Sequence, residues 1–503
     1  MRDGKFFAVG NDEEILALKN QGTEVVDLQG KIIIPGFNDN HIHIWKVGNL
    51  LTYMLDLRGV RSREEMLDKI RDYAHANPQL EWIQARGFNE VNFSDQRMPN
   101  KHDLDAISTT RPICITRTCA HQIVVNSKAL EICKIDRQTI SPPGGEIKLL
   151  QDGSIAGHFT ETAIGLVLTH IPKYSAAQLR QMVLAAQDEF LSMGITSATD
   201  PAVDKDLLDV YISMDRNNEL KIKINAIPIR VPDGSNKIYP LPQFYSGRHL
   251  KVDTVKFFAD GGISGKTAAL KIPYQHTDEK GVLRIQRAAF KKLAEETQAG
   301  GFRIATHAIG DTAIEMVVSV LNEIAFMNDA DIRHRIEHLG LPSQHDLWLM
   351  KELNISAVMQ PVFIYELGKN FRNYLDHDYL NRIYPLQNVL EHGICLSLST
   401  DAPVVKNYDP IVNIRFAMQR RDEEGVPIAY DQRLSFEAAI SAYTRGSAEA
   451  CGDLRSKGTI RSGAVADFII ADHYTSDMKI SSVYADGTLH HSGADIHTIQ
   501  QNN

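Results

Sequence analysis

Residues 335–360 read RIEHLGLPSQHDLWLMKELNISAVMQ, and this stretch contains the unit that decides the fold. A short run, RIEH (residues 335–338), is followed by a polar turn, by a helix-like segment and by a second apolar run, ISAVMQ (residues 355–360). Such a unit is typical of parallel β-strands that are connected through an α-helix. How often the unit recurs therefore determines which α/β fold the chain can adopt.

The same unit recurs along much of the chain. Six further β-branched or apolar runs are followed by polar turns: residues 31–35 (KIIIP), 195–200 (ITSATD), 223–229 (KINAIPI), 255–260 (VKFFAD), 302–307 (FRIATH) and 395–401 (CLSLSTD). Amphipathic segments such as residues 286–299 lie between them. Eight strands that alternate with helices predict an α/β protein with a closed, TIM-like (β/α)8 barrel. The rival fold, an open doubly wound sheet, predicts a Gly-rich phosphate turn after its first strand, and the sequence has none there.

The segments outside these units predict two additions to a barrel at residues 35–454. The distance between the first and the second run is too long for one βα unit, so an inserted α/β subdomain is expected at about residues 50–190. The two ends of the chain contain short alternating runs broken by Gly, Asp and Asn. They predict a small β-sandwich domain that is assembled from both termini, residues 1–34 and 455–490.

The composition is that of an ordinary globular protein. Of 503 residues, 43% are hydrophobic and 23% are charged, which predicts a large buried core. The net charge of −9 argues against a nucleic-acid-binding protein, which would normally have a basic patch. Five scattered cysteines without a C-x-x-C pair indicate no disulfide framework. No signal peptide or membrane-spanning segment is expected, so the cytoplasm is the default location.

Two histidines, His41 and His43, follow the first apolar run in the sequence NHIH (residues 40–43). Alternate residues of a strand point to the same side, so the two imidazoles are expected to project into the same space. At the carboxyl end of a barrel strand that space is the mouth of the active site. Two neutral imidazoles there form half of a site for zinc or a similar ion.

Later runs end in residues that bind metals as well. His307 closes RIATH, His338 closes RIEH and Asp401 closes LSTD. Side chains at the same ends of several barrel strands converge on the barrel axis. A lone histidine at a strand end is more often structural, but five such residues at predicted strand ends indicate a metal site.

Lys256 lies in the apolar run VKFFA (residues 255–259). Burial lowers the pKa of a lysine, and the neutral amine can then react with CO₂ to give a carbamate. A carbamate would supply an anionic pair of oxygens that can bridge two metal ions. The alternatives are an ion pair with Asp260 or a side chain that points outward, and the spacing leaves both of them open.

These segments together resemble the amidohydrolase superfamily, specifically its YtcJ-like branch of N-substituted formamide deformylase-like metal-dependent hydrolases. The matching stretches are PGFNDNHIH (35–43), VKFFADGGISGKTAAL (255–270), ATHAIGD (305–311), RIEHLGL (335–341), LSTDAPV (398–404), RGFNE (86–90) and GTIRSGAVADFIIAD (458–472). The resemblance covers nearly the whole chain.

The resemblance implies a binuclear metal centre with two divalent ions, for which zinc is the expected metal. The ligands that it implies are His41 and His43 for the more buried ion, His307 and His338 for the second ion, a Lys256 carboxylated by CO₂ as the bridge, and Asp401 to complete the site.

The implied reaction is the hydrolysis of an amide or formamide C–N bond, other than a peptide bond, in a small molecule. A hydroxide shared by the two metal ions is the nucleophile, and Asp401 is the general base. Alternatives on the same barrel are a mononuclear deaminase and a cyclic-amide or ester hydrolase. A catalytically weak regulatory or binding protein is an alternative of another class, although a binding module has no reason to keep all of these ligands.

Four further residues are candidates for contacts with the substrate. His121 and Glu161 lie in the inserted subdomain, whereas Trp45 and Phe363 follow predicted barrel strands. Each has a structural alternative, because a turn histidine or a packing aromatic would occupy the same position in the sequence. The expected partner is a small molecule, with neither nucleic acid nor membrane. Barrels of this kind often pair, which makes a homodimer one expectation.

Overall fold

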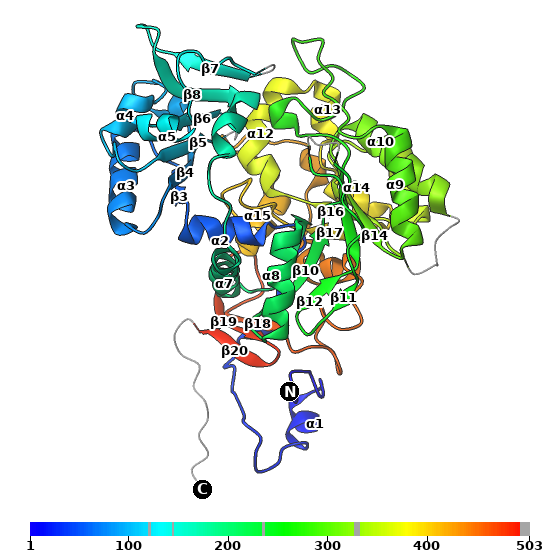
Figure 1. Ribbon diagram of the computed structural model, residues 1–503. Helices are drawn as coiled ribbons and strands as arrows, with labels where there is room; N and C mark the ends of the chain where they lie inside the picture. The colour runs from blue at the N-terminus through cyan, green and yellow to red at the C-terminus, as the bar shows by residue number, and fades with distance from the viewer. Residues whose placement is uncertain (119–121, 143–144, 234–236, 326–331, 493–503) are drawn as a thin grey trace. The chain divides into compact units, whose positions relative to one another are not determined.

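A computed structural model describes residues 1–118, 122–142, 145–233, 237–325 and 332–492. The backbone divides into two compact units (Figure 1). Unit 1 comprises Met1–Ile44 and Ala186–Asn503, and unit 2 comprises Trp45–Ala185. Each unit has its own sheets, and helices α2 (Ile44–Thr52) and α7 (Ala176–Ser192) contain the two points at which the chain passes between the units.

The parallel strands of unit 1 form two sheets. The first has the order β11 (Tyr245–Ser246), β12 (Leu250–Val252), β10 (Lys223–Pro228), β9 (Ile195–Val203) and β2 (Phe37–Asp39). The second has the order β13 (Thr254–Phe258), β14 (Arg303–Ala308), β15 (Arg335–His338), β16 (Ser356–Met359) and β17 (Leu396–Leu398). All neighbours are parallel except β11 and β12. Seven of the eight predicted runs therefore contain a strand of these sheets.

Both edges of the second sheet are linked to the first, although the described residues form no continuous ladder around the two. An isolated parallel bridge joins Ile229, just after β10, to Lys256 in β13. At the other edge the segments after β2 and β17 exchange backbone hydrogen bonds: the Asp401 N–H donates to the His41 carbonyl at 2.7 Å, and the His43 N–H to the Ala402 carbonyl at 2.9 Å. Residues that follow β2 and β17 therefore lie side by side.

The run at residues 31–35 was wrongly counted among the barrel strands. It forms β1 (Ile32–Pro35), which pairs antiparallel with β18 (Phe468–Ala471) in a separate sheet. The strand that leads to His41 is β2, and Gly36 separates the two strands. A Cβ at Gly36 would lie 2.2 Å from Oγ1 of Thr196, so only glycine lets the chain pass this closely from one sheet to the other.

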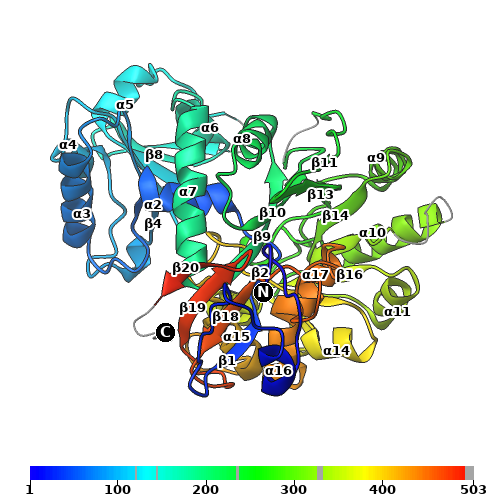
Figure 2. The same ribbon diagram turned by 90° about the horizontal axis from the view of Figure 1, so that it is seen from below.

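The two ends of the chain meet in one antiparallel sheet with the order β1, β18, β19 (Ile480–Ala485) and β20 (Thr488–Ser492) (Figure 2). A second facing sheet, which the predicted sandwich requires, is not formed by the described residues. The N-terminal segment adds a bridge from Lys5 to Val465, the buried side chain of Phe6, which packs in an apolar cluster with Phe468, and helix α1 (Asp12–Leu16), none of whose residues is buried.

The helices that follow the parallel strands of unit 1 bury apolar residues against them. In α10, residues Ile314, Val317 and Leu321 follow helical spacing and are fully or almost fully buried. The helices are α8 (Lys205–Arg216), α9 (Arg287–Ala299), α10 (Asp311–Ile324), α11 (Gln344–Glu352), α12 (Val362–Tyr374), α13 (His377–Arg382), α14 (Leu386–Glu391), α15 (Pro410–Gln419), α16 (Phe436–Ser441), the π-helix η6 (Ala442–Gly446) and α17 (Ser447–Ala450).

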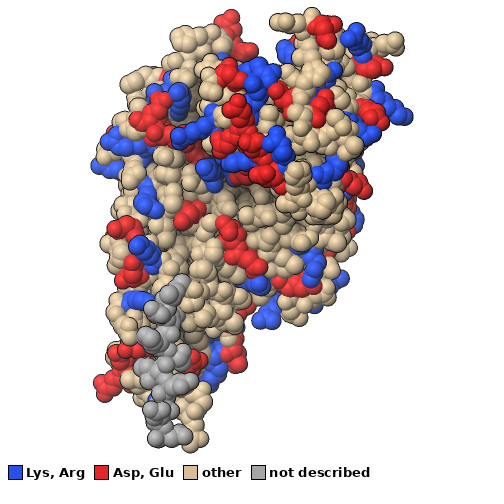
Figure 3. Space-filling view, turned by 90° about the vertical axis from the view of Figure 1, so that its left-hand side faces the viewer, with Lys and Arg blue, Asp and Glu red and all other residues tan. Residues whose placement is uncertain are grey.

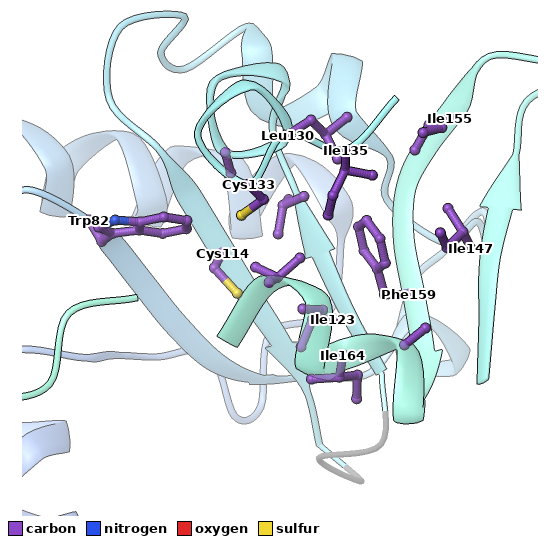
Figure 4. Packing of buried hydrophobic residues seen from close by; sticks show 14 residues of the cluster. Trp82, Cys114, Ile123, Leu130, Cys133, Ile135, Ile147, Ile155, Phe159 and Ile164 are labelled. Atoms are coloured by element: carbon purple, nitrogen blue, oxygen red, sulfur yellow. The ribbon is translucent and has the colours of Figure 1, made fainter. Parts of the chain in front are cut away.

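Unit 2 contains a mixed sheet with the order β3 (Leu55–Asp56), β4 (Ile83–Phe88), β5 (Ile113–Arg117), β6 (Gln122–Val125), β8 (Ile155–Glu161) and β7 (Gly145–Leu149). Its helices are α3 (Arg63–Ala76), α4 (Lys101–Asp105), α5 (Ser127–Ile132) and α6 (Gly165–Leu168). Along β5, Ile113 and Ile115 enter one apolar cluster, whereas Cys114 enters another cluster with Phe159 (Figure 4). This alternation gives the sheet an apolar core on both faces.

On the face drawn in Figure 3, Lys and Arg side chains lie among Asp and Glu side chains. Within the described ranges, every helix is too short or too polar to cross a bilayer.

Candidate metal centre

Three ligand-type side chains meet where β2 and β17 end. The Nε2 atoms of His41 and His43 lie 3.4 and 3.3 Å from the same oxygen, Oδ1 of Asp401. His338, the last residue of β15, joins them, because the potential ligand atoms of His41, His338 and Asp401 all lie within 4.8 Å of one another. The ring of His307 in β14 lies next to His338, with 4.4 Å between the ring centroids. The five predicted histidine and aspartate residues are thus brought together.

The two histidines of the H-x-H motif follow β2 and are not part of it. Their rings are 5.9 Å apart and nearly perpendicular, so strand alternation does not describe their arrangement. Instead Asp39 holds the turn: its carboxylate accepts the His41 N–H at 3.2 Å, the Thr400 N–H at 3.2 Å and the Thr400 hydroxyl at 2.7 Å. Burial raises the pKa of Asp39 to about 7 against the effect of these bonds. Asp39 therefore ties the turn after β2 to the turn before Asp401.

Two of the converging residues have strained backbones. The φ angles of Asp401 and His338 are 62° and 72°, and Leu339 also has a positive φ of 47°. Residues with a side chain rarely adopt this left-handed region, and each such residue costs on the order of 1 kcal/mol. Strain of this kind persists where the surroundings impose it and is concentrated at functional sites.

Hydrogen bonds fix the tautomer of His41. Its Nδ1 lies 2.5 Å from Oε2 of Glu337, a buried carboxylate that can only accept. Nδ1 therefore carries the proton, and the Nε2 atom that faces Asp401 has a free lone pair. A carboxylate behind the imidazole is the arrangement that orients histidine ligands in metal sites.

Hydrogen bonds also fix the tautomers of His338 in β15 and of His307 in β14. Nδ1 of His338 donates to Oε1 of Gln360 at 2.8 Å, and the Gln360 amide donates to Oγ of Ser399 at 2.9 Å, which sets the orientation of the amide. Nε2 of His307 donates to the carbonyl of Gly261 at 3.2 Å. Burial lowers the pKa of His307 to about 3 and that of His338 well below the usual range. Each ring is thus neutral and has one nitrogen available to a ligand.

Lys256 is fully buried in β13, and among the described residues its Nζ has no hydrogen-bond partner. Burial lowers the pKa of this amine to about 8, against the effect of the Glu337 and Asp401 carboxylates. The ion pair with Asp260, which the sequence left open, is not formed. The Asp260 carboxylate instead accepts the backbone N–H groups that follow β13 and β14, namely those of Ala269, Ile309 and Gly310.

The sequence reasoning missed a buried ion pair behind the site. Nε of Arg335 lies 2.5 Å from Oε1 of Glu337, and its two terminal nitrogens donate to Oδ1 and the carbonyl of Asn40 at 3.0 and 2.6 Å. Arg335 and His41 together hold the pKa of Glu337 well below its usual range, although burial acts in the opposite direction. A signal was present: in RIEH, two opposite charges stand two residues apart in an apolar strand and so face the same side.

The four candidate substrate residues have different places. Phe363, in the first turn of α12, is buried and stacks on His338 with 5.8 Å between ring centroids. Trp45 belongs to unit 2 and packs against Tyr174, and Glu161 ends β8 of that unit. His121 lies outside the described residues. Contact with a substrate remains a prediction for all four.

A sequence model of the amidohydrolase family matches residues 24–490, which is nearly the whole chain. The chain belongs to the amidohydrolase family. The putative amidohydrolase YtcJ of Bacillus subtilis is 28% identical over 460 residues, which cover 89% of this chain and 85% of the relative. The N-substituted formamide deformylase of Arthrobacter pascens is 22% identical, over 97% of this chain and 93% of that enzyme. The predicted YtcJ-like branch is thereby confirmed, and the general class of this family member is that of a hydrolase.

A solved structure agrees with the assignment. The crystal structure of an uncharacterized metal-dependent hydrolase from Pyrococcus horikoshii has a TM-score of 0.79 and 25% sequence identity, and the match covers 98% of this chain and 95% of that chain. The α/β class predicted from the alternating runs is confirmed by this likeness and by the parallel sheets.

Proposed function

We propose that this amidohydrolase is a metal-dependent enzyme that hydrolyses amide or formamide C–N bonds in small molecules. One observation carries the proposal: two imidazole Nε2 atoms converge within 3.4 Å on one carboxylate oxygen of Asp401. Buried imidazoles set against a carboxylate are the donors that a zinc-like divalent ion prefers. A structural histidine cluster has no need of a buried carboxylate that fixes a tautomer, as Glu337 does for His41.

We also propose the architecture that the family likeness favours. The bridge at Ile229 and the hydrogen bonds between the segments after β2 and β17 would close the two sheets into a (β/α)8 barrel. Unit 2 would be the subdomain inserted into that barrel, and the four-stranded sheet would be the core of a domain composed of both chain ends. The candidate ligands would then lie at the carboxyl ends of the barrel strands.

The donor set fits two divalent ions, with zinc as the expected metal. His41 and His43 would hold one ion and His307 and His338 the other, with Asp401 as a further ligand. The buried Lys256 amine, which lacks a hydrogen-bond partner among the described residues, fits a carbamate bridge: its nitrogen would bond to the carbon of CO₂ and release one proton. Bound ions of this kind lower the pKa of water and polarise the carbonyl of a substrate.

Side chains of the protein would orient the metal ligands and transfer the proton. Glu337 keeps the proton of His41 on Nδ1, so that Nε2 stays unprotonated. When their rings are protonated, His41 and His43 lower the pKa of Asp401 against the effect of burial, which favours its ionised carboxylate. Asp401 would take the proton of the attacking water and return it to the leaving nitrogen, as a general base and then a general acid.

A second candidate is a mononuclear deaminase or cyclic-amide hydrolase with an unmodified Lys256. One observation favours it: among the residues that the structure describes, the compact group of potential ligand atoms consists of His41, His338 and Asp401. Because the two candidates share the same fold and the same base, the metal content distinguishes them better than any contact does.

The test is the number of metal ions per chain, measured by elemental mass spectrometry on protein purified without chelators. Wild type is compared with Lys256→Ala and with Lys292→Ala, an exposed lysine of α9. About two ions, lost in part only in Lys256→Ala, would support the binuclear amide hydrolase and lead to N-formyl and N-acyl amines as substrates. About one ion in all three proteins would favour the mononuclear candidate. No metal after reconstitution would overturn both.

A further inference from the structure

A separate pocket of about 360 Å³ lies in unit 1 at the amino ends of β15, β16 and β17. Its lining includes Arg333, Asn354 and Cys395, which precede these three strands by one or two residues. The candidate metal ligands lie at the opposite ends of parallel strands, since His338 ends β15. The pocket thus contains none of the residues of the candidate metal centre.

The pocket is positively charged, although the chain as a whole carries a net charge of −9. Arg333, Lys351 and Arg445 line it, against the single carboxylate of Glu449. Oε1 of Glu449 lies 3.0 Å from a terminal guanidinium nitrogen of Arg333. Among the described residues, the Lys351 amine donates to an uncharged group, the carbonyl of Gly393. In the part of the chain that the structure describes, Arg445 has neither an ion pair nor a hydrogen bond through its side chain. Among the described residues, two positive charges in the pocket therefore have no counter-charge.

A π-helical turn presents Arg445 to the pocket. The π-helix η6 (Ala442–Gly446) contributes Ala442, Arg445 and Gly446 to the lining. Gly446 packs directly on β17, where a Cβ would lie only 2.1 Å from the carbonyl oxygen of Leu396. Wide turns of this kind are rare in proteins and are frequent at functional sites. The close contact at Gly446 fixes the turn against the strand and thereby sets the position of Arg445 at the rim of the pocket.

We propose that this pocket binds a compact oxyanion with the size and charge of a phosphate group, either free or as part of a small molecule. Guanidinium groups match the oxygens of such anions geometrically, and Arg445 and Arg333 supply two of them. Lys351 adds a point charge, and the side chains of Ser441 and Asn354 on the same lining supply hydroxyl and amide donors. The volume is within the range of small-molecule sites. The proposal does not depend on the proposed hydrolase activity.

The experiment is a calorimetric titration of the full chain with inorganic phosphate, with ionic strength held constant by chloride. Wild type is compared with Arg445→Gln, with Lys351→Gln and with Arg455→Gln. Arg455 is also an exposed arginine of unit 1 but does not line the pocket, so its variant carries the same change of charge. We expect saturable binding that Arg445→Gln and Lys351→Gln each weaken about fivefold and that Arg455→Gln leaves unchanged.

Two results would overturn the proposal. One is the absence of saturable binding to wild type at millimolar phosphate. The other is binding that both pocket variants leave as strong as in wild type, which would place the anion elsewhere in the molecule, for example on a bound metal. Because Arg445→Gln could disturb the π-helical turn, the thermal midpoints of all variants are measured, and Lys351→Gln tests the pocket without changing that turn.

Discussion

The strand ends of unit 1 and the sheet of unit 2 are buried to the same degree but consist of opposite chemistry. In unit 2, apolar side chains such as Phe88, Ile115 and Phe159 fill both faces of the sheet and have no exposed surface. In unit 1, strand β15 buries Arg335 and Glu337 with at most 1% exposed. Burial of the first kind stabilises the fold, whereas burial of charge costs free energy unless every charge is paired.

The comparison shows where this chain gives up stability. The buried charges of Arg335 and Glu337 form an ion pair. The Glu337 carboxylate also accepts the Nδ1–H of His41 and thereby fixes the tautomer of that imidazole. The positive φ angles of Asp401 and His338 add backbone strain at the same place. Unit 2 has no comparable cost along the described part of β5 or β6. A group of residues that lowers the stability of the fold, and whose side chains are nevertheless held in place by hydrogen bonds, is expected at a functional site.

The largest effect is expected from Glu337→Ala. The substitution leaves the guanidinium of Arg335 buried without its charge partner, and it removes the acceptor that orients His41. We expect a loss of about 4 kcal/mol in the free energy of unfolding, measured with urea. We also expect a loss of bound metal from the folded protein. Glu337→Gln, which keeps an acceptor oxygen but no charge, should lie between this variant and wild type.

A variant Glu337→Ala that unfolds like wild type would show that the ion pair makes no net contribution. The buried ion pair of unit 1 would then not differ from the apolar core of unit 2 in its dependence on a paired charge. Normal metal content in Glu337→Ala would separately remove the role of Glu337 in orienting His41.

The next effect is expected from Phe159→Ala in unit 2. Phe159 is fully buried in the cluster that also contains Ile123 and Cys114, so its removal leaves a cavity. We expect a loss of about 3 kcal/mol in stability, measured by the same urea unfolding. Metal content should be unchanged, because the substitution affects only apolar packing. Loss of metal in Phe159→Ala as large as in Glu337→Ala would mean that the two regions are not independent.

The sequence predicted most of the strands, because buried parallel strands have short apolar runs that few other elements share. It misplaced residues 31–35, since an apolar run does not indicate which of two sheets it enters. That assignment depended on Gly36, whose close approach to Thr196 cannot be inferred from neighbours in the sequence. The expected sandwich was inferred from alternation at the chain ends, but alternation gives no measure of how much surface a segment buries.

The five converging histidine and aspartate residues were predicted from their common position at strand ends. The partners behind them were harder to predict, because the bonds of Glu337 to His41 and of Arg335 to Asn40 join residues almost 300 positions apart. Only the R-x-E pattern in β15 indicated that two charges share one face. The lowered pKa of Lys256 was expected from burial, whereas the missing ion pair with Asp260 depends on backbone groups of the two segments that follow β13 and β14.

A smaller effect is expected at the amino end of the same strands, where charges are only partly buried. Asp253 precedes β13 and lies 2.7 Å from Arg303, which begins β14, and 3.5 Å from Lys251. Burial raises the pKa of Asp253, but Arg303 and Lys251 outweigh it and lower the pKa to about 2. The carboxylate of a folded protein with such a pKa contributes stability above the unfolded value of about 4, and this contribution is lost as the pH falls from about 4 to about 2.

Because the Asp253 side chain is 31% exposed, we expect the contribution to be about 1 kcal/mol and not the full value of the shift. The check is the free energy of unfolding of wild type and Asp253→Asn between pH 6 and pH 3. The difference between them should be constant above about pH 5 and should shrink as the pH falls. A difference that stays constant down to pH 3 would show that Asp253 has no lowered pKa in the folded state.

The smallest effect is expected from Ser343→Ala, in the loop that follows the buried strand end. Ser343 begins α11 with a capping box, in which its hydroxyl accepts the Asp346 N–H at 3.1 Å and the Asp346 carboxylate accepts the Ser343 N–H at 2.8 Å. Loss of the cap should reduce the free energy of unfolding by about 1 kcal/mol, and Ser343→Gly by only a few tenths, since glycine is tolerated at this position. Metal content should stay normal in both, because His338 is held by Gln360 and by the buried network and not by α11. Ser343 lies only four residues beyond Leu339. If Ser343→Ala released metal, the position of His338 would depend on the surface helix α11. The buried metal ligands and the surrounding fold would then not be independent of each other.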